Sequence, residues 1–369
     1  MIAYAPFLTL LLPIRMAALA GAARVEWLGT ATLAGAAAAG LSNIAAGWAS
    51  DVAKTRRFWM GLGLCLTVAS YAPLHLADTP AGLVAAVVAY QVALNLLLAP
   101  MTAWAADAVP PERRGLLGGL LGAGPPAAAL AGPVVMLPAL ELWMRPVMLC
   151  SAIVALTSPL ILSERTAAPP AVPEHERVGA GNRTDFLLLW SARLLVQVAG
   201  SILFGFLLYY LQGLPDAPSP VEVAALSAAA FFLAFPISLA IGRYSDRLRR
   251  RKPVLAIAAL LAAAGLAVMA VEIRTAVAAL GYALFGCAST VFLALHSGVA
   301  IGYLPSPARR GRDLGVLNLA NTLPAMLAPA LAIGLVPGRG FAPLLALATG
   351  LVVIAAICVL LVRETPEAT

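Results

Sequence analysis

Polar side chains that could bind a solute are few in this sequence, and they lie inside long apolar stretches. Arg193 and Gln197 are four residues apart, as are Gln91 and Asn95. Residues at this spacing share one face of a helix, so each pair predicts a polar stripe. Such a stripe can bind the polar groups of a solute, or it can hydrogen-bond two helices together.

Asn318 and Asn321, three residues apart, predict a third stripe. Because a charge in hydrocarbon is expensive and usually faces a cavity, we predict one shared polar cavity that binds a solute. Its predicted lining is Arg15, Gln91, Asn95, Arg193, Gln197, His296, Asn318 and Asn321. Two alternatives stay open: Arg15 is long enough to snorkel to the outer interface, and His296 fits a proton carrier or a satisfied core histidine.

The composition places these residues in a membrane protein. Of the 369 residues, 62% are hydrophobic and 11% are charged, whereas a soluble domain is about half apolar and a quarter charged. The net charge of +7 comes from short arginine-rich clusters between apolar stretches, not from the contiguous basic face that nucleic-acid binding needs. Four cysteines without CxxC spacing and three scattered histidines predict no metal and no cofactor.

Stretches long enough to cross a bilayer recur along the whole chain. A transmembrane helix needs about 20 apolar residues. We therefore predict an all-α membrane protein with twelve such helices, at 2–23, 27–49, 58–77, 81–105, 114–138, 143–162, 185–212, 221–242, 253–272, 275–303, 312–336 and 341–362.

The connections between these stretches alternate between basic and nearly neutral. Basic clusters lie at Lys54–Arg57, Arg247–Lys252 and Arg309–Arg312. Cytoplasmic loops carry an excess of Lys and Arg, so we place these loops, and with twelve helices both termini, in the cytoplasm beneath the inner (plasma) membrane. The polar segment 163–184 predicts a flexible cytoplasmic linker between six-helix halves at 1–162 and 185–369.

Two loop motifs repeat at nearly one offset, which indicates a duplicated six-helix unit. Gly47, Asp51 and the basic pair Arg56–Arg57 recur 195 residues later as Gly242, Asp246 and Arg251–Lys252. Pro111, Arg113, Arg114 and Gly115 recur 196 residues later as Pro307, Arg309, Arg310 and Gly311. Proteins built from such repeats bind their substrate near the midplane, between the halves.

These motifs resemble the signature loop between the second and third helices of the major facilitator superfamily, where Gly and Asp precede a basic cluster. The second copy matches well, with Arg249 in place of the inner glycine. The first copy has Val52, Lys54 and Thr55 where the family often has Arg, Gly and Arg. The resemblance covers essentially the whole chain and implies a transporter with two pseudo-symmetric six-helix bundles.

The resemblance also implies that these loops form a charged latch that holds the outward-open state. Glycine lets helices approach closely, and Asp can pair with Arg or accept backbone N–H bonds. The predicted gating residues are Gly47, Asp51, Arg56, Arg57, Gly242, Asp246, Arg247 and Arg250. Alternatively, these arginines only set the topology and bind anionic lipid headgroups.

A narrower resemblance concerns the solute. Residues 311–330 look like the eleventh-helix region of sucrose-type and glycoside-type symporters of the superfamily, which implies a polar solute. The fifth predicted helix only partly resembles the Gly-Pro-x-x-Gly-Gly motif of drug antiporters, because the final glycine pair is missing.

The driving force is left open by the sequence. Glu141, Glu222 and Glu272 lie near predicted helix ends, and no Asp or Glu lies in mid-membrane. Since proton-coupled transporters often use a buried carboxylate, coupling to protons would need His296, Glu222 or a charge on the solute. A buried arginine without an acidic partner favours an anionic solute, which supplies the counter-charge.

We therefore predict a monomeric secondary transporter, surrounded by lipid, that moves a small polar or anionic solute by alternating access. One alternative is an efflux antiporter for drugs or metabolites. Another is a non-transporting sensor or assembly protein, suggested by the incomplete first loop motif and a first helix that looks short at its cytoplasmic end. Without paired carboxylates, nucleophile–base spacing or a phosphate loop, we predict no enzyme.

Overall fold

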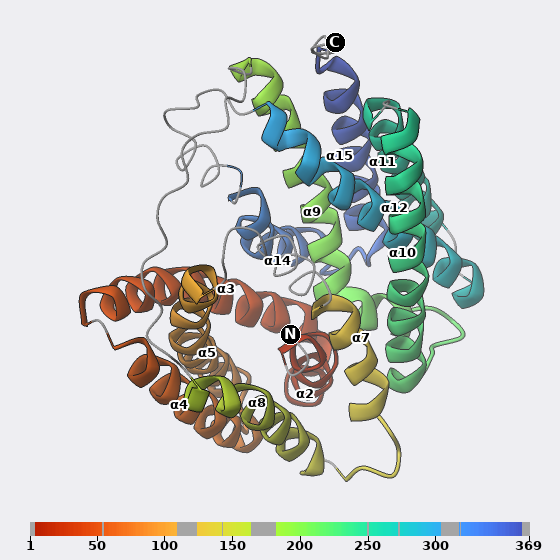
Figure 1. Cartoon of the computed structure of the whole chain (residues 1–369). Helices are drawn as coiled ribbons and strands as arrows, with labels where there is room; N and C mark the ends of the chain where they lie inside the picture. The colour runs from red at the N-terminus through yellow and green to blue at the C-terminus, as the bar shows by residue number, and fades with distance from the viewer. Residues whose placement is uncertain are drawn as a thin grey trace. The chain divides into compact units, whose positions relative to one another are not determined.

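The computed structural model describes residues 4–53, 55–108, 124–141, 143–163, 182–248, 251–271, 274–303, 317 and 319–363. Every regular element within these ranges is a helix (Figure 1). In a bilayer a backbone N–H or C=O must find its partner inside the protein, and a helix satisfies both within one segment. The prediction of an all-α membrane protein is confirmed.

Among the described residues, nine helical stretches are long and apolar enough to cross a membrane. The first, Tyr4–Ser50, is 47 residues long and covers two of the predicted helices. The predicted helices 114–138 and 312–336 are described only in part, as α7 (Gly124–Val135) and α14 (Pro324–Leu335). The multi-pass character is thus established, whereas the count of twelve stays a prediction.

The chain divides into two compact units, Met1–Glu174 and His175–Thr369. In the first unit, α5 packs against both α3 and α4. The described elements of this unit are α1 (Tyr4–Pro6), η1 (Phe7–Leu11), α2 (Leu12–Ala20), η2 (Gly21–Ala23), α3 (Arg24–Ala53), α4 (Arg56–Leu76), α5 (Pro80–Ala108), α7 and α8 (Met144–Ser163).

A tight turn joins the first two predicted helices. α2 ends at Ala20, and Gly21 has a φ angle of 53°, in the left-handed region that glycine adopts readily. The 3₁₀ turn η2 then leads directly into α3. The first helix therefore ends slightly earlier than the sequence predicts, and the second begins slightly earlier.

In the second unit, α9 is the central helix. It contacts α10, α12, α14 and α15, and side chains along it, such as Leu189, Val196 and Ile202, are buried. The described elements of this unit are α9 (Arg183–Gln212), α10 (Pro220–Leu248), α11 (Arg251–Val271), α12 (Thr275–Gly302), α14 and α15 (Ala342–Leu361).

The start of α10 is held by a capping box. Ser219 donates from its backbone N–H to Glu222 Oε2 (2.7 Å), and the Glu222 N–H donates back to Ser219 Oγ (3.3 Å). This reciprocal pair satisfies donors that a helix start leaves unpaired. Glu222, one of the residues suggested for proton coupling, thus has a structural role in the first turn of its helix.

Close helix contacts occur at glycines other than those of the loop motifs. A Cβ atom on Gly63 of α4 would lie 2.7 Å from the backbone of Leu96 and Leu97 in α5. On Gly47 or Gly242, by contrast, a Cβ atom would meet nothing within 4 Å. No described atom of either unit therefore makes a close contact with these two glycines, and their part in the latch stays a prediction.

We expect Gly63→Ala to lower the melting temperature of the purified protein, since the added methyl group must push α4 and α5 apart. Overpacking of this kind costs about 1–3 kcal/mol. Gly61→Ala is the matched control, because it lies two residues away on α4 with nothing within 4 Å of its Cβ position. Equal melting temperatures for the two variants would contradict the close contact between α4 and α5.

Candidate functional site

Four predicted lining residues come together in the second unit. Arg193 and Gln197 lie on α9, His296 lies on α12, and Asn321 lies just before α14. Arg193 Nε and Gln197 Nε2 both donate to Asn321 Oδ1, at 2.7 and 3.2 Å. With Ser297, these residues form what we call the Arg193 cluster, and the helical spacing of 193 and 197 accounts for their common partner.

Hydrogen bonds within the cluster define the state of His296. The Arg193 Nη1 group donates to Ser297 Oγ at 3.0 Å and lies 3.4 Å from His296 Nδ1. A guanidinium can only donate, so Nδ1 accepts. The proton is then on Nε2, which donates to the Leu189 carbonyl at 2.9 Å. In this arrangement His296, which is fully buried, is neutral.

The charge of Arg193 is held by neutral groups only. Its partners are an amide oxygen, a hydroxyl and an imidazole, and no Asp or Glu of the described residues forms an ion pair with it. Its Nη2 group has no hydrogen-bond partner in the described part of the chain. Because a half-buried cation without a counter-charge is unfavourable, the cluster can attract an anionic group.

The polar pair of the first unit is arranged differently. Asn95 and Gln91 are buried, at 8% and 4% exposure. Asn43 Nδ2 on α3 donates to Asn95 Oδ1 on α5 at 3.0 Å, and Asn95 Nδ2 donates to the Gln91 carbonyl at 2.8 Å. Gln91 Nε2 reaches the Tyr4 hydroxyl at 3.4 Å. The Asn43–Asn95 and Gln91–Tyr4 bonds join α5 to α3 and to α1, which is the alternative role that the sequence left open.

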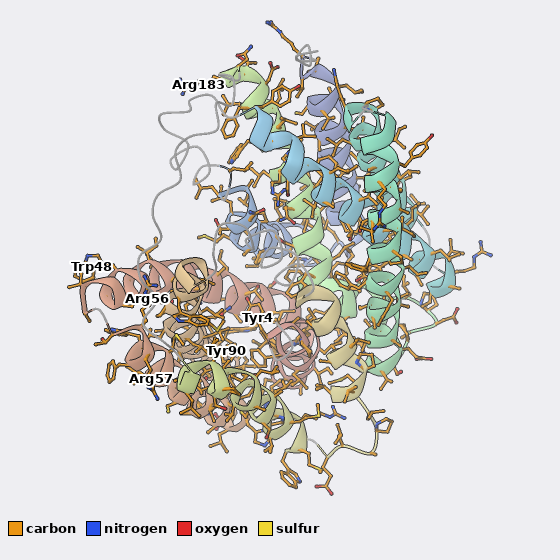
Figure 2. All side chains as sticks on the ribbon, viewed as in Figure 1. Tyr4, Trp48, Arg56, Arg57, Tyr90 and Arg183 are labelled. Atoms are coloured by element: carbon orange, nitrogen blue, oxygen red, sulfur yellow. The ribbon has the colours of Figure 1, made fainter. Side chains whose placement is uncertain are left out.

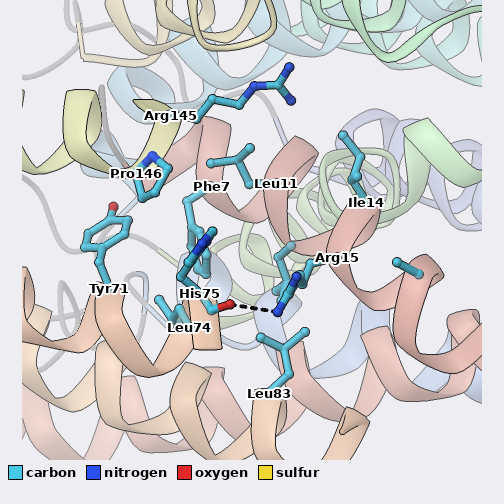
Figure 3. A pocket seen from close by; sticks show the side chains of 12 residues that line it. Phe7, Leu11, Ile14, Arg15, Tyr71, Leu74, His75, Leu83, Arg145 and Pro146 are labelled. Carbon is cyan, nitrogen blue, oxygen red and sulfur yellow. Dashed lines mark hydrogen bonds between the residues drawn. The ribbon is translucent and has the colours of Figure 1, made fainter. Parts of the chain in front are cut away.

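Arg15 also has partners within the first unit. Its Nη2 group donates to the carbonyl of His75 at 2.7 Å (Figure 3) and to that of Ala77 at 2.8 Å, where α4 ends. The carbonyl end of a helix carries a partial negative charge that favours a cation. Arg15 therefore lies level with a helix end, which favours the interface position over a place in a shared cavity.

The predicted gating residues are described only in part. Arg56 begins α4 and Arg57 follows it with an exposed side chain; Figure 2 labels both, together with the exposed Trp48 of α3. Gly47 and Gly242 lie within α3 and α10. The side chains of Asp51, Asp246 and Arg247, and all of Arg250 and Asn318, lie outside the described residues. The latch therefore stays a prediction.

The sequence did not predict the hydrogen bonds that Ser297 and Lys252 form. Ser297 accepts from Arg193 while donating to the Leu293 carbonyl at 3.0 Å, but an isolated serine in an apolar helix carries no signal of such a role. Lys252 donates from Nζ to the Val362 carbonyl, so this member of the basic loop motif caps the end of α15. A lysine near a helix C-terminus commonly does so.

Comparisons with known proteins agree with this architecture. The family model of the Major Facilitator Superfamily matches residues 2–215 and 189–369. A search of curated proteins found no match.

Several solved transporters share the fold. A bacterial homologue of the human lysosomal transporter Spinster, inward-facing and occupied, has 18% identity and a TM-score of 0.68, with 99% of this chain and 97% of that chain covered. The nucleoside transporter NupG has 16% identity and a TM-score of 0.69, covering 98% and 96%. The inward-open xylose transporter XylE from E. coli has 14% identity and a TM-score of 0.68, covering 100% and 92%.

At these identities the solved structures show the fold alone, whereas the family match extends over nearly the whole sequence. The chain therefore belongs to the major facilitator superfamily and is a multi-pass membrane transporter, not an enzyme.

Proposed function

We propose that this transporter moves a small polar or anionic solute across the inner (plasma) membrane by alternating access. The observation that carries the proposal is the half-buried Arg193, which is held by neutral partners and lacks a carboxylate among the described residues. A solute carboxylate or phosphate would supply the missing charge. Nη2 remains available to donate to either group, because Nε and Nη1 are already engaged by Asn321, Ser297 and His296, and hydrogen bonds to a charged oxygen are strong.

The neighbouring amide supports a solute that is polar as well as charged. Gln197 uses its Nε2 group to reach Asn321, and its Oε1 atom has no hydrogen-bond partner in the described residues. An unused acceptor thus lies one helical turn from the Nη2 donor of Arg193. A hydroxyl or N–H group on the solute could donate to this oxygen while its anionic group binds the arginine.

The same geometry bears on the driving force. Glu222 caps α10, and both ring nitrogens of His296 are engaged in a neutral arrangement. Neither residue is poised as a proton carrier, so we propose that the charge that drives or opposes transport is carried by the solute. Protons then couple to transport through the ionisation of the solute.

The proposed orientation rests on the basic connections. Arg56 and Arg57 begin α4, and Arg251 and Lys252 begin α11. Loops with an excess of Lys and Arg lie on the cytoplasmic side, so we propose that these ends, and both chain termini, are cytoplasmic. We further propose that the protein works as a monomer.

We expect Arg193→Gln to lower solute flux at least about tenfold in proteoliposomes tested with sugars, organic acids and drugs. A hydrogen bond to a charged group contributes about 1.5–3 kcal/mol, and each 1.4 kcal/mol is a factor of ten. Arg193→Lys should give an intermediate flux, because lysine keeps the charge but lacks the planar guanidinium with its several N–H donors. Arg183→Gln, at the exposed start of α9, is the matched control and should retain full flux.

Unchanged flux in a stable Arg193→Gln protein would overturn the role of this residue. Flux of cationic drugs only, with Arg193 dispensable, would instead favour the efflux antiporter. Binding of a solute without any flux, seen as a shift in melting temperature, would favour the sensor.

A separate measurement tests His296. We expect His296→Gln to retain solute exchange within a few-fold, because a glutamine amide can also accept from Arg193 and donate to Leu189. In the His296→Gln protein, the rate of counterflow without a pH gradient and the rate of uptake driven by a pH gradient should then fall by the same factor. Loss of gradient-driven uptake alone, with counterflow intact, would show that His296 carries the coupled proton.

A further inference from the structure

The first unit contains a cavity apart from the Gln91–Asn95 pair. It has a volume of about 200 Å³ and is lined by the first helical segment, α4, α5 and α8 (Figure 3). Most of its wall is apolar and includes Phe7, Leu11 and Leu74. Its polar lining comes from Arg15, His75, Arg145 and Tyr71, and the described residues around it include no Asp or Glu.

Two guanidinium groups line this cavity, and neither forms an ion pair with a described residue. Arg15 bonds only to backbone carbonyls, and its buried Nε atom has no partner. Arg145 forms no hydrogen bond or ion pair with any described residue, and its Nε atom is also buried. Two like charges beside one small, mostly apolar space repel each other. An anion in the cavity would relieve this repulsion and supply acceptors for both arginines.

The depth of the cavity in the membrane indicates where the anion comes from. α4 ends at Leu76 and α8 begins at Met144, so the charged lining lies where helices leave the bilayer. Trp143 is 55% exposed, and its indole N–H donates to Glu141 Oε2. A tryptophan with an apolar body and a bonded N–H is typical of the headgroup layer. Phosphate groups of lipids lie at this depth.

The surface around the cavity is apolar. Leu76 and Val147, next in sequence to the lining residues His75 and Pro146, are 74% and 52% exposed, as expected of side chains that contact acyl chains. The cavity is smaller than the roughly 300–1,000 Å³ of pockets that enclose a drug-sized ligand. It therefore fits one part of a larger molecule whose remainder lies in the bilayer.

We propose that this cavity binds an anionic phospholipid. The lipid phosphate lies between Arg15 and Arg145, and the adjoining part of an acyl chain lies against Phe7, Leu11 and Leu74. The bound lipid links α2 to α8 and so stabilises the first unit. The proposal depends neither on the identity of the transported solute nor on the Arg193 cluster.

The test is a lipid titration of the purified full-length protein, followed by native mass spectrometry and by melting temperature. Phosphatidylglycerol and phosphatidylcholine with the same acyl chains differ in headgroup charge. We expect phosphatidylglycerol to bind more tightly and to raise the melting temperature more. Arg145→Gln should weaken phosphatidylglycerol binding about fivefold, the effect of one arginine near an anionic membrane surface, and reduce the preference for phosphatidylglycerol over phosphatidylcholine.

Two matched variants separate the cavity from general surface charge. Arg339→Gln removes an exposed arginine of the second unit that does not line the cavity, and it should keep the preference for phosphatidylglycerol. Ala18→Trp fills the cavity from the exposed face of α2 while retaining both arginines, and it should abolish the preference. Ala18→Leu is the milder version if the tryptophan lowers expression.

Three results would overturn the proposal. The first is an Arg145→Gln protein that binds phosphatidylglycerol as tightly as the wild type. The second is an unchanged lipid preference in the Ala18 variants, which would mean that no acyl chain enters the cavity. The third is a rise in melting temperature with inorganic phosphate equal to that with phosphatidylglycerol, which would identify a site for a free anion.

Discussion

In the hydrocarbon core of a membrane, a backbone N–H or C=O has no water to bond and must be satisfied within the protein. Long helices meet this requirement, and the described residues form them wherever the chain is apolar for long enough. The same solvent provides no hydrophobic force to press helices together, so close packing depends on small residues. Gly63 against the backbone of α5, and Gly265 beside Gly281 between α11 and α12, are such contacts.

Polar side chains inside the bilayer must also find partners within the protein, and the two units differ in how far they do so. In the first unit, the buried Asn95 bonds to the exposed Asn43 and to the Gln91 carbonyl, and the buried Gln91 side chain bonds to the Tyr4 hydroxyl. In the second unit, Arg193 has three neutral partners and retains both its charge and an unused donor group. A satisfied network stabilises a bundle, whereas an unsatisfied charge is a place for a ligand. This contrast is why the proposed solute site rests on Arg193.

Arg15 and Arg193 show how depth changes the role of one residue type. Arg15 reaches the carbonyl end of α4 and lies beside a cavity at the membrane boundary, with Arg145 as a second unpaired cation. Arg193 lies on the central helix of its unit, among buried neighbours. An anion is expected at both places, but from different sources: a lipid headgroup at the boundary and a transported solute further inside.

The sequence by itself determined the class of protein, the ends of most helices to within a few residues, the basic connections and the superfamily. The protein class and the helix ends depend on local composition and on the helical period, which are present in a short window of the chain. The superfamily follows from loop motifs that the sequence carries twice, 195 residues apart. The sequence also placed Arg193 and Gln197 on one helix face, because that follows from their spacing alone.

Only the tertiary structure decided which polar residues meet. Asn321 lies far along the chain from Arg193, and their contact depends on how α9 packs beside α12 and α14. Likewise, Gly63 rather than Gly47 lies against another helix, although both are glycines in apolar helices. Such pairings are set by side-chain shape across a helix interface, and this information is distributed over residues far apart in the sequence.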